Sequence, residues 1–94
     1  MKNKMEDRYV QYAKTMVTGL CEFPGQTTCE RTDDERGVLL TFQVAKADMP
    51  RIVGKAGATV EMIRKLVRTA GMLENARVAL KIADPLGGDA DRLN

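Results

Sequence analysis

The chain of 94 residues contains no histidine, no tryptophan and only two cysteines, Cys21 and Cys29. Two cysteines without histidine do not supply the four ligands of a zinc site, and no CxxC pair occurs. The lack of histidine also removes the usual base of a catalytic triad. No Walker A loop is present, because Gly54-Lys55 is followed by Ala56 rather than Ser or Thr. We therefore expect no metal, no cofactor and no enzymatic activity.

Long apolar runs are missing as well. No stretch of eighteen apolar residues occurs, so no transmembrane helix is predicted. The N-terminal stretch MKNKMEDRYVQ has two lysines but no apolar region behind them, unlike a secretory signal. We expect a cytoplasmic protein with no membrane partner. In that compartment the cysteines are predicted to be free thiols, with a Cys21–Cys29 disulfide as the alternative.

The formal net charge is only +2, but the charges are unevenly distributed. Residues 46–82 hold eight basic and three acidic side chains, a net charge of +5. The segments before and after them are slightly acidic. A concentrated basic excess is typical of a surface that binds a polyanion, although an ordinary solvated surface is the alternative.

The apolar spacing predicts three helices and three strands in the order α-β-β-α-α-β. Steps of three and four residues indicate a helix over 5–21 and another from 57 or 58 to 70, with Gly71 as its C-terminal cap. Asp48 is expected at the N-cap of a short helix that Gly54 ends. Strands are predicted over 27–31, 38–45 and 77–83, with the polar stretch TDDERG as the turn of a hairpin. These elements predict a two-layer α/β (α+β) sandwich, with a three-stranded sheet covered by helices on one face.

Two glycines three residues apart, Gly54 and Gly57, separate the two later helices. Gly54 is placed where a positive φ is commonly needed, and Gly57 lies at the N-cap of the next helix. The first N–H groups of that helix and its dipole favour an anion such as a phosphate. With no Cβ at either glycine, a nucleic-acid backbone can approach the main chain. A simple helix–helix turn remains the alternative explanation.

The residues around these glycines carry a family resemblance. The pattern [IV]-[IV]-G-x-x-G-x-x-[IV]-x-x-[IL] is satisfied by Ile52, Val53, Gly54, Gly57, Val60 and Ile63. The sequence strongly resembles a KH domain of type II, an RNA-binding module whose GxxG loop clamps about four nucleotides. The stretch VAKADMPRIVGKAGAT, residues 44–59, is similar to the small stand-alone bacterial KhpA family. The resemblance covers nearly the whole chain, so we expect one domain over 1–84 and a disordered tail over 85–94.

The resemblance implies that Gly54-Lys55-Ala56-Gly57 grips single-stranded RNA. The residues expected to contact it are Gly54, Lys55, Ala56, Gly57, Ala58, Thr59, Arg51, Ile52, Arg64 and Arg68. Arg64 and Arg68 are included because like charges four residues apart work against their own helix. The family usually has a basic residue directly after the second glycine, where this chain has Ala58. We expect weaker RNA binding as a result, and Arg51 and Arg64 are the candidates for supplying that charge.

The resemblance also implies partners. These are single-stranded RNA, and a second copy of the chain or a larger KH-containing protein of the KhpB (Jag) type. The implied role is that of an RNA chaperone or post-transcriptional regulator. The alternative is a KH-fold protein-interaction module, used for dimerisation, with little or no RNA binding. Aromatic residues are scarce, so a base-stacking platform of the RRM or OB type is not supported.

Overall fold

The computed structural model describes residues 7–83 and confirms the predicted α-β-β-α-α-β order. The helices are α1 (Arg8–Leu20), α2 (Met49–Val53) and α3 (Ala58–Met72). The strands are β1 (Thr28–Asp34), β2 (Gly37–Gln43) and β3 (Val78–Ile82). The predicted tail at 85–94 and the first residues of the predicted helix over 5–21 lie outside the described residues. No helix in the described part of the chain is long and apolar enough to cross a membrane.

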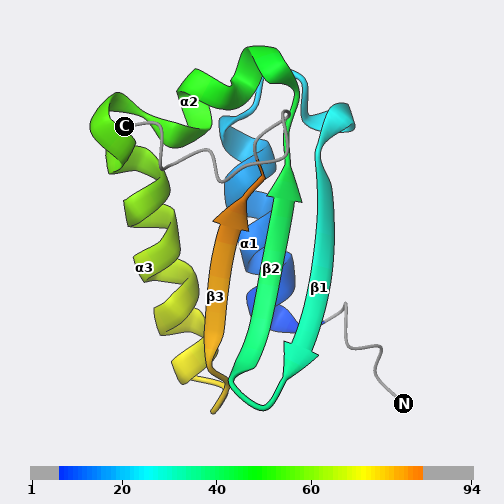
Figure 1. Cartoon of the computed structure of the whole chain (residues 1–94), viewed down its shortest axis with the longest axis vertical. Helices are drawn as coiled ribbons and strands as arrows, with labels where there is room; N and C mark the ends of the chain where they lie inside the picture. Colours follow the sequence, from blue (N-terminus) through cyan, green and yellow to red (C-terminus); the bar gives the residue numbers. More distant parts are fainter. Residues whose placement is uncertain (1–6, 84–94) are drawn as a thin grey trace.

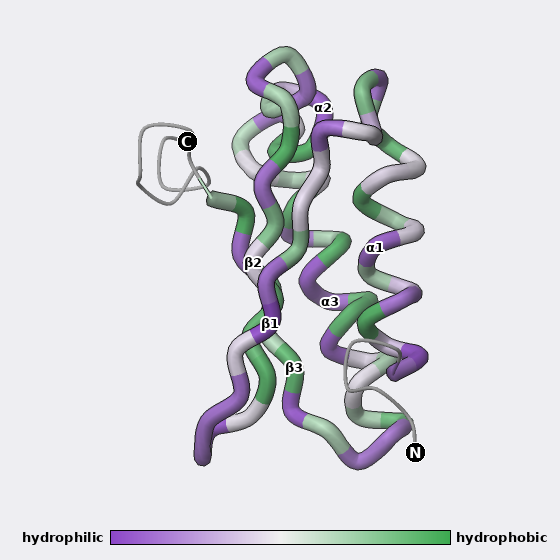
Figure 2. The backbone as a smooth tube through the Cα atoms, turned by 90° about the vertical axis from the view of Figure 1, so that its right-hand side faces the viewer, coloured by the Kyte–Doolittle hydropathy of each residue, from purple (hydrophilic) through white to green (hydrophobic). Residues whose placement is uncertain are grey.

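The three strands form one sheet in the order β1-β2-β3, with the helices on one of its faces (Figure 1). β1 and β2 are antiparallel, as a hairpin requires, whereas β2 and β3 are parallel. A parallel pair needs a long crossover connection, and here α2 and α3 provide it. Figure 2 shows the sheet and the helices as two layers. The prediction of a two-layer α+β sandwich is therefore confirmed.

The core lies between these two layers and follows the predicted periodicities. Alternate residues of β2 and β3 are buried on the helix-facing side, namely Val38, Leu40, Phe42, Val78, Leu80 and Ile82. The helices contribute residues at three- and four-residue steps, namely Val10, Ala13, Val17, Val60, Ile63 and Val67. Because β2, β3 and the helices each have one apolar face, this packing removes these side chains from water.

The hairpin turn is shorter than the predicted stretch TDDERG. β1 continues through Asp34, which pairs with Gly37 of β2, so that only Glu35 and Arg36 lie between the strands. Aspartate is disfavoured in strands. Here both carboxylates have arginine partners that offset this preference: Arg31 binds Asp33 at 2.8 Å and Arg36 binds Asp34 at 3.0 Å.

Gly71 is not a helix cap, contrary to the prediction. α3 continues to Met72 and its C-cap is Leu73, while the left-handed residue that follows is Asn75, with φ 58°. Gly71 is buried where α3 packs against β3, and a Cβ at this position would overlap the side chain of Val78. The residue is a glycine because the helix and the strand approach each other closely here.

Three residues of the predicted apolar faces are exposed instead of lying in the core. Tyr12 and Leu20 of α1 are 42% and 40% exposed, and Leu66 of α3 is 49% exposed. All three line hollows between α1 and α3, outside the layer of side chains that meets the sheet. The apolar periodicity correctly predicted the helices, but it could not show how many of their apolar residues the sheet covers.

Candidate nucleic-acid interface

Gly54 ends α2 with a left-handed backbone and lies directly against the start of α3. Its φ is 76°, and its N–H donates to the carbonyl of Pro50 at 3.0 Å. A Cβ at Gly54 would overlap the Thr59 side chain and backbone. The space that the missing Cβ leaves is therefore filled by Thr59 of the same chain, rather than being open to a ligand as the sequence suggested. Gly54 therefore allows the close contact between the end of α2 and the start of α3 that closes the loop.

Gly57 has the open backbone that the sequence predicted for both glycines. It is the N-cap of α3, with φ 78°, and apart from its two chain neighbours no described residue has a heavy atom within 4 Å of the position of an added Cβ. No side chain in the described part of the chain caps the first turn of α3. The side chains of Lys55, Ala56 and Ala58 around it are exposed. The turn therefore presents main chain and one positive charge to the solvent, an arrangement suited to a phosphate.

Ala56 has a left-handed backbone, with φ 54° and ψ 31°. Such a conformation is uncommon for a residue with a Cβ and costs roughly 1–2 kcal/mol. It lets Lys55, Ala56 and Gly57 turn within a single 3₁₀ turn before α3 begins. Aspartate and asparagine tolerate this region better than other residues with side chains, so Ala56→Asp is a suitable probe of the loop.

Asp48 and Arg51 hold α2 against the end of α1. Asp48 is fully buried, and its carboxylate accepts hydrogen bonds from the N–H groups of Glu22 and Phe23 at 2.7 and 2.9 Å. Arg51 donates from Nε to the carbonyl of Leu20, the last residue of α1, at 3.0 Å. Asp48 does occupy the N-cap position of α2, as predicted, but its side chain does not cap that helix. Both contacts fix the position of the helix that leads into the loop.

Ile52 is a correction to the predicted set of RNA-contacting residues. Its side chain is 0% exposed and belongs to the hydrophobic core. It lies on the inner side of α2, so a bound strand cannot reach it in this structure. Gly54, Lys55, Ala56, Gly57, Ala58 and Thr59 form one continuous turn, with Arg51 beside it on α2.

Arg64 and Arg68 lie further along α3 and have different surroundings. The side chain of Arg64 is 20% exposed. Its Nε donates to the carbonyl of Leu80 at 3.0 Å, and its Nη1 lies 3.4 Å from the carboxylate of Glu61. Arg64 therefore links α3 to β3. Arg68 is exposed and lies near the start of β3, at the far end of the helix from the loop.

The two cysteines are free, as predicted. Burial raises the pKa of both the Cys21 and Cys29 thiols above the ordinary value, which favours the protonated form near neutral pH. Among residues 7–83 no group of three or more His, Cys, Asp or Glu side chains is placed to hold a metal ion.

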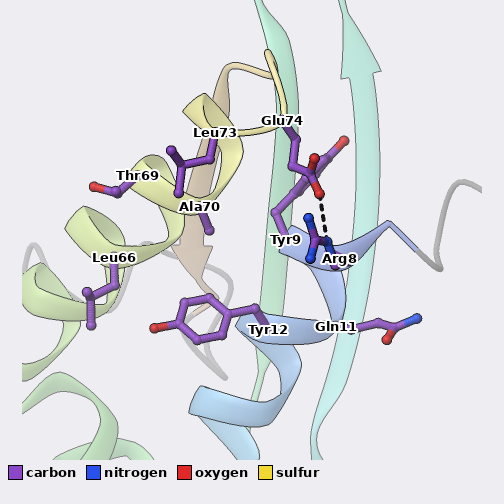
Figure 3. Close-up of a pocket in the computed structure, with 9 residues that line it drawn as sticks. All are labelled: Arg8, Tyr9, Gln11, Tyr12, Leu66, Thr69, Ala70, Leu73 and Glu74. Atoms are coloured by element: carbon purple, nitrogen blue, oxygen red, sulfur yellow. Dashed lines mark hydrogen bonds and ion pairs between the residues drawn. The ribbon is translucent and has the colours of Figure 1, made fainter.

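A second surface, not singled out from the sequence, runs along the helices. Two grooves of about 490 and 450 Å³ lie between α1 and α3 and share Leu66. Figure 3 shows the first groove, with Tyr12, Leu66 and Leu73 around it and the 3.0 Å ion pair of Arg8 and Glu74 at its edge. The exposed apolar side chains along both grooves are Tyr12, Leu20, Met62, Leu66 and Leu73. The helices carry more apolar residues than one buried stripe requires, and this excess is the feature of the sequence that could have indicated the second surface.

The element order, the parallel β2–β3 pair and the glycine loop between α2 and α3 define a KH domain of type II. Comparison with protein families agrees, because the KhpA/KhpB KH-domain family matches residues 10–82. The chain belongs to this family.

Three relatives illustrate the similarity, and each is named RNA-binding protein KhpA. The protein of Clostridium perfringens is 33% identical over 72 residues, which cover 77% of this chain and 96% of the relative. The Bacillus subtilis protein is 30% identical over 69 residues, covering 73% and 85%. The Clostridium acetobutylicum protein is 29% identical over 72 residues, covering 77% and 96%. No solved structure gives a significant match.

Proposed function

We propose that this protein binds single-stranded RNA through the loop Gly54-Lys55-Ala56-Gly57, gripping about four nucleotides. The observation that carries the proposal is the open, left-handed Gly57 at an uncapped helix start, beside the exposed Lys55. The names of the relatives support it. The protein acts in the cytoplasm as an RNA chaperone or post-transcriptional regulator, without enzymatic activity.

The loop residues have distinct roles in this proposal. The N–H groups at the start of α3 face the RNA phosphates, and Lys55 supplies a mobile positive charge. Gly57 lets the strand approach because nothing projects from its Cα. Thr59, packed against Gly54, keeps the loop closed behind the ligand. Arg51 adds positive charge beside the loop, although its Nε is already bound to Leu20.

The proposal is tested with the double variant Lys55→Asp/Ala56→Asp. Binding of a fluorescein-labelled RNA with a randomised sequence is measured over a range of salt concentrations, and folding is checked by circular dichroism. We expect a loss of affinity of tenfold or more, on the order expected when phosphate contacts are replaced by repulsion. A folded variant that binds RNA as tightly as the parent would overturn the proposal.

The chain offers a matched control for this experiment. Lys46 and Ala47 form the same dipeptide, are both exposed and lie at the other end of α2. Lys46→Asp/Ala47→Asp makes the same change of charge outside the loop. An equal loss of affinity in both variants would show that overall charge, not the loop, governs binding.

We also propose self-association, or pairing with a larger KhpB-type protein, through the apolar face between α1 and α3. The exposed Tyr12, Leu66 and Leu73 favour it, because apolar patches of this kind commonly mark interfaces. One loop of four nucleotides binds weakly, and two linked loops gain avidity. If the loop variant leaves RNA binding unchanged, this interaction becomes the protein's main function.

Leu66→Glu tests this interface. A buried, unpaired carboxylate is costly, so we expect the variant to be monomeric at concentrations where the parent associates, by analytical ultracentrifugation. Met72→Glu is the control, since Met72 is exposed on the same helix but lines neither groove. A parent that stays monomeric, or a Leu66→Glu variant that associates equally well, would contradict the proposed interface.

A further inference from the structure

A hollow of about 540 Å³ is lined by residues of the β1–β2 turn and the start of β3. These segments lie at the end of the sheet away from the glycine loop (Figure 1). Three arginines from three different elements surround the hollow. Arg36 comes from the β1–β2 turn, Arg68 from α3, and Arg77 from the segment before β3. We call this site the arginine hollow. All three side chains are exposed, yet the fold brings them together from positions up to 41 residues apart in the sequence.

Two of these arginines have no partner within the described part of the chain. Arg36 is bound to Asp34 at 3.0 Å, so its charge is largely balanced. For Arg68 and Arg77, residues 7–83 provide no ion pair and no side-chain hydrogen bond. Guanidinium groups bind phosphates through two parallel hydrogen bonds, and they stack well on flat rings. The hollow therefore has positive charge available for a ligand.

The lining of the hollow is apolar between these charges. Leu39 of β2 is 37% exposed, and Ala79 of β3 beside it is also exposed. The two residues are directly paired across the sheet and point to the face without helices. An apolar floor with guanidinium groups at its rim fits a nucleotide, whose base rests on the floor while its phosphate meets an arginine. Among residues 7–83, Asp34 supplies the only carboxylate that lines the hollow, and it is already paired with Arg36.

The arginine hollow lies along the direction in which α3 leaves the loop. α3 begins at Ala58 and runs beside β3 to the end of the sheet where the hollow is (Figure 1). At 1.5 Å per residue, Arg68 is about 16 Å along the helix from Gly57. Arg64 lies between them and is directed at the edge of β3 through its bond to Leu80. Basic side chains thus continue from the loop to the hollow.

We infer that the arginine hollow binds a further part of the same single-stranded RNA, beyond the nucleotides held by the loop. This inference rests on the proposed RNA binding and extends it. Arg68 and Arg77 bind the phosphates, and Leu39 and Ala79 support a base. The favoured occupant is RNA rather than an acidic peptide, because the hollow combines its charges with an apolar floor. The footprint of the protein on RNA is then longer than four nucleotides.

The test compares randomised, fluorescein-labelled RNAs of four and twelve nucleotides with the variant Arg68→Ala/Arg77→Ala. We expect the variant to bind the longer RNA roughly tenfold more weakly and the shorter RNA as the parent does. The slope of log affinity against log salt for the longer RNA should fall by about 1.4, the value for two phosphate contacts on a single strand. Lys46→Ala/Lys65→Ala removes the same charge from exposed positions outside the hollow and should leave the preference for the longer RNA intact.

The outcomes separate this inference from the proposed function. If Lys55→Asp/Ala56→Asp abolishes binding of both RNAs while Arg68→Ala/Arg77→Ala changes neither, the loop site stands and the hollow is not an RNA site. An equal loss of affinity for the longer RNA in Arg68→Ala/Arg77→Ala and Lys46→Ala/Lys65→Ala would also overturn the inference. A third result would overturn it as well: the parent binds a polyglutamate peptide, and Arg68→Ala/Arg77→Ala abolishes that binding without changing the affinity for the longer RNA. If the loop variant binds both RNAs normally, the proposed function itself fails.

Discussion

The buried carboxylate of Asp48 accepts a hydrogen bond from the backbone N–H of Phe23 at 2.9 Å. Its second oxygen accepts the neighbouring N–H of Glu22 at 2.7 Å. These two N–H groups follow the end of α1, while Asp48 lies directly before α2. One side chain therefore joins the end of the first helix to the start of the helix that carries the glycine loop.

Asp48→Ala should destabilise the protein. The substitution leaves two N–H groups without their acceptor, and such losses are expensive when water cannot replace it. We expect the melting temperature to fall by at least about 5 °C for a domain of this size. Asp48→Asn keeps one acceptor oxygen, so its melting temperature should lie between those of the parent and Asp48→Ala. An unchanged melting temperature of Asp48→Ala in thermal unfolding would show that the contact is dispensable.

The stability of the protein should depend on Asp48 in acid. Burial by itself raises the pKa of this carboxyl group, but the hydrogen bonds from Glu22 and Phe23 and the nearby Arg51 lower it, and the net pKa lies below the ordinary value. Because the pKa is lower in the folded than in the unfolded state, the ionised group stabilises the fold above about pH 4. That stabilisation is lost as the pH falls through the lowered value. The difference in melting temperature between the parent and Asp48→Asn should therefore shrink below about pH 4. Parallel curves down to pH 2 would contradict this assignment.

Gly71→Ala and Gly19→Ala should have opposite effects, although both glycines lie in helices. A Cβ at Gly71 overlaps Val78, whereas a Cβ at Gly19 meets nothing within 4 Å. We expect Gly71→Ala to cost about 1–3 kcal/mol, as overpacking does, and Gly19→Ala to gain up to about 1 kcal/mol. Urea unfolding measures both free energies. A stabilised Gly71→Ala variant would mean that α3 and β3 separate without cost.

Ala58→Arg should strengthen the proposed RNA binding. Ala58 is exposed in the first turn of α3, where the family usually has a basic residue, so the new guanidinium lies beside the proposed phosphate site. We expect affinity to rise about threefold at low salt, with a salt slope steeper by about 0.7. Thr28→Arg adds the same charge on the distant edge strand β1 and is the control. Equal gains in both variants would point to a general charge effect.

Much of the fold was predictable from local patterns. The alternation of Val38, Leu40 and Phe42 identified a strand, and the steps through Val60, Ile63 and Val67 identified a helix. Both patterns depend only on the number of residues per backbone repeat, so they can be recognised from the sequence alone. Gly54 and Gly57 were also recognisable, because a positive φ restricts the choice of residue.

The candidate site was only partly predictable. Ile52 was expected to contact RNA because it is one of the apolar residues around the glycine pair, but it faces the core. Gly54 was expected to be open, yet Thr59 of the same chain packs against it. Nearness in sequence shows which residues share a loop, but it does not show which side of the backbone the rest of the protein covers.

The sequence by itself determined the order of the elements, the apolar faces of β2 and β3 and the glycines at which the backbone turns left-handed. Only the tertiary structure determined the features that depend on long-range contacts. It directed Asp48 to Phe23 and Arg64 to Leu80, left Tyr12 and Leu66 exposed, and gathered Arg68 and Arg77 around one hollow. The reason is physical. Periodicity and glycine geometry act within a few residues, whereas burial and charge partners depend on which surfaces meet once the helices cover the sheet.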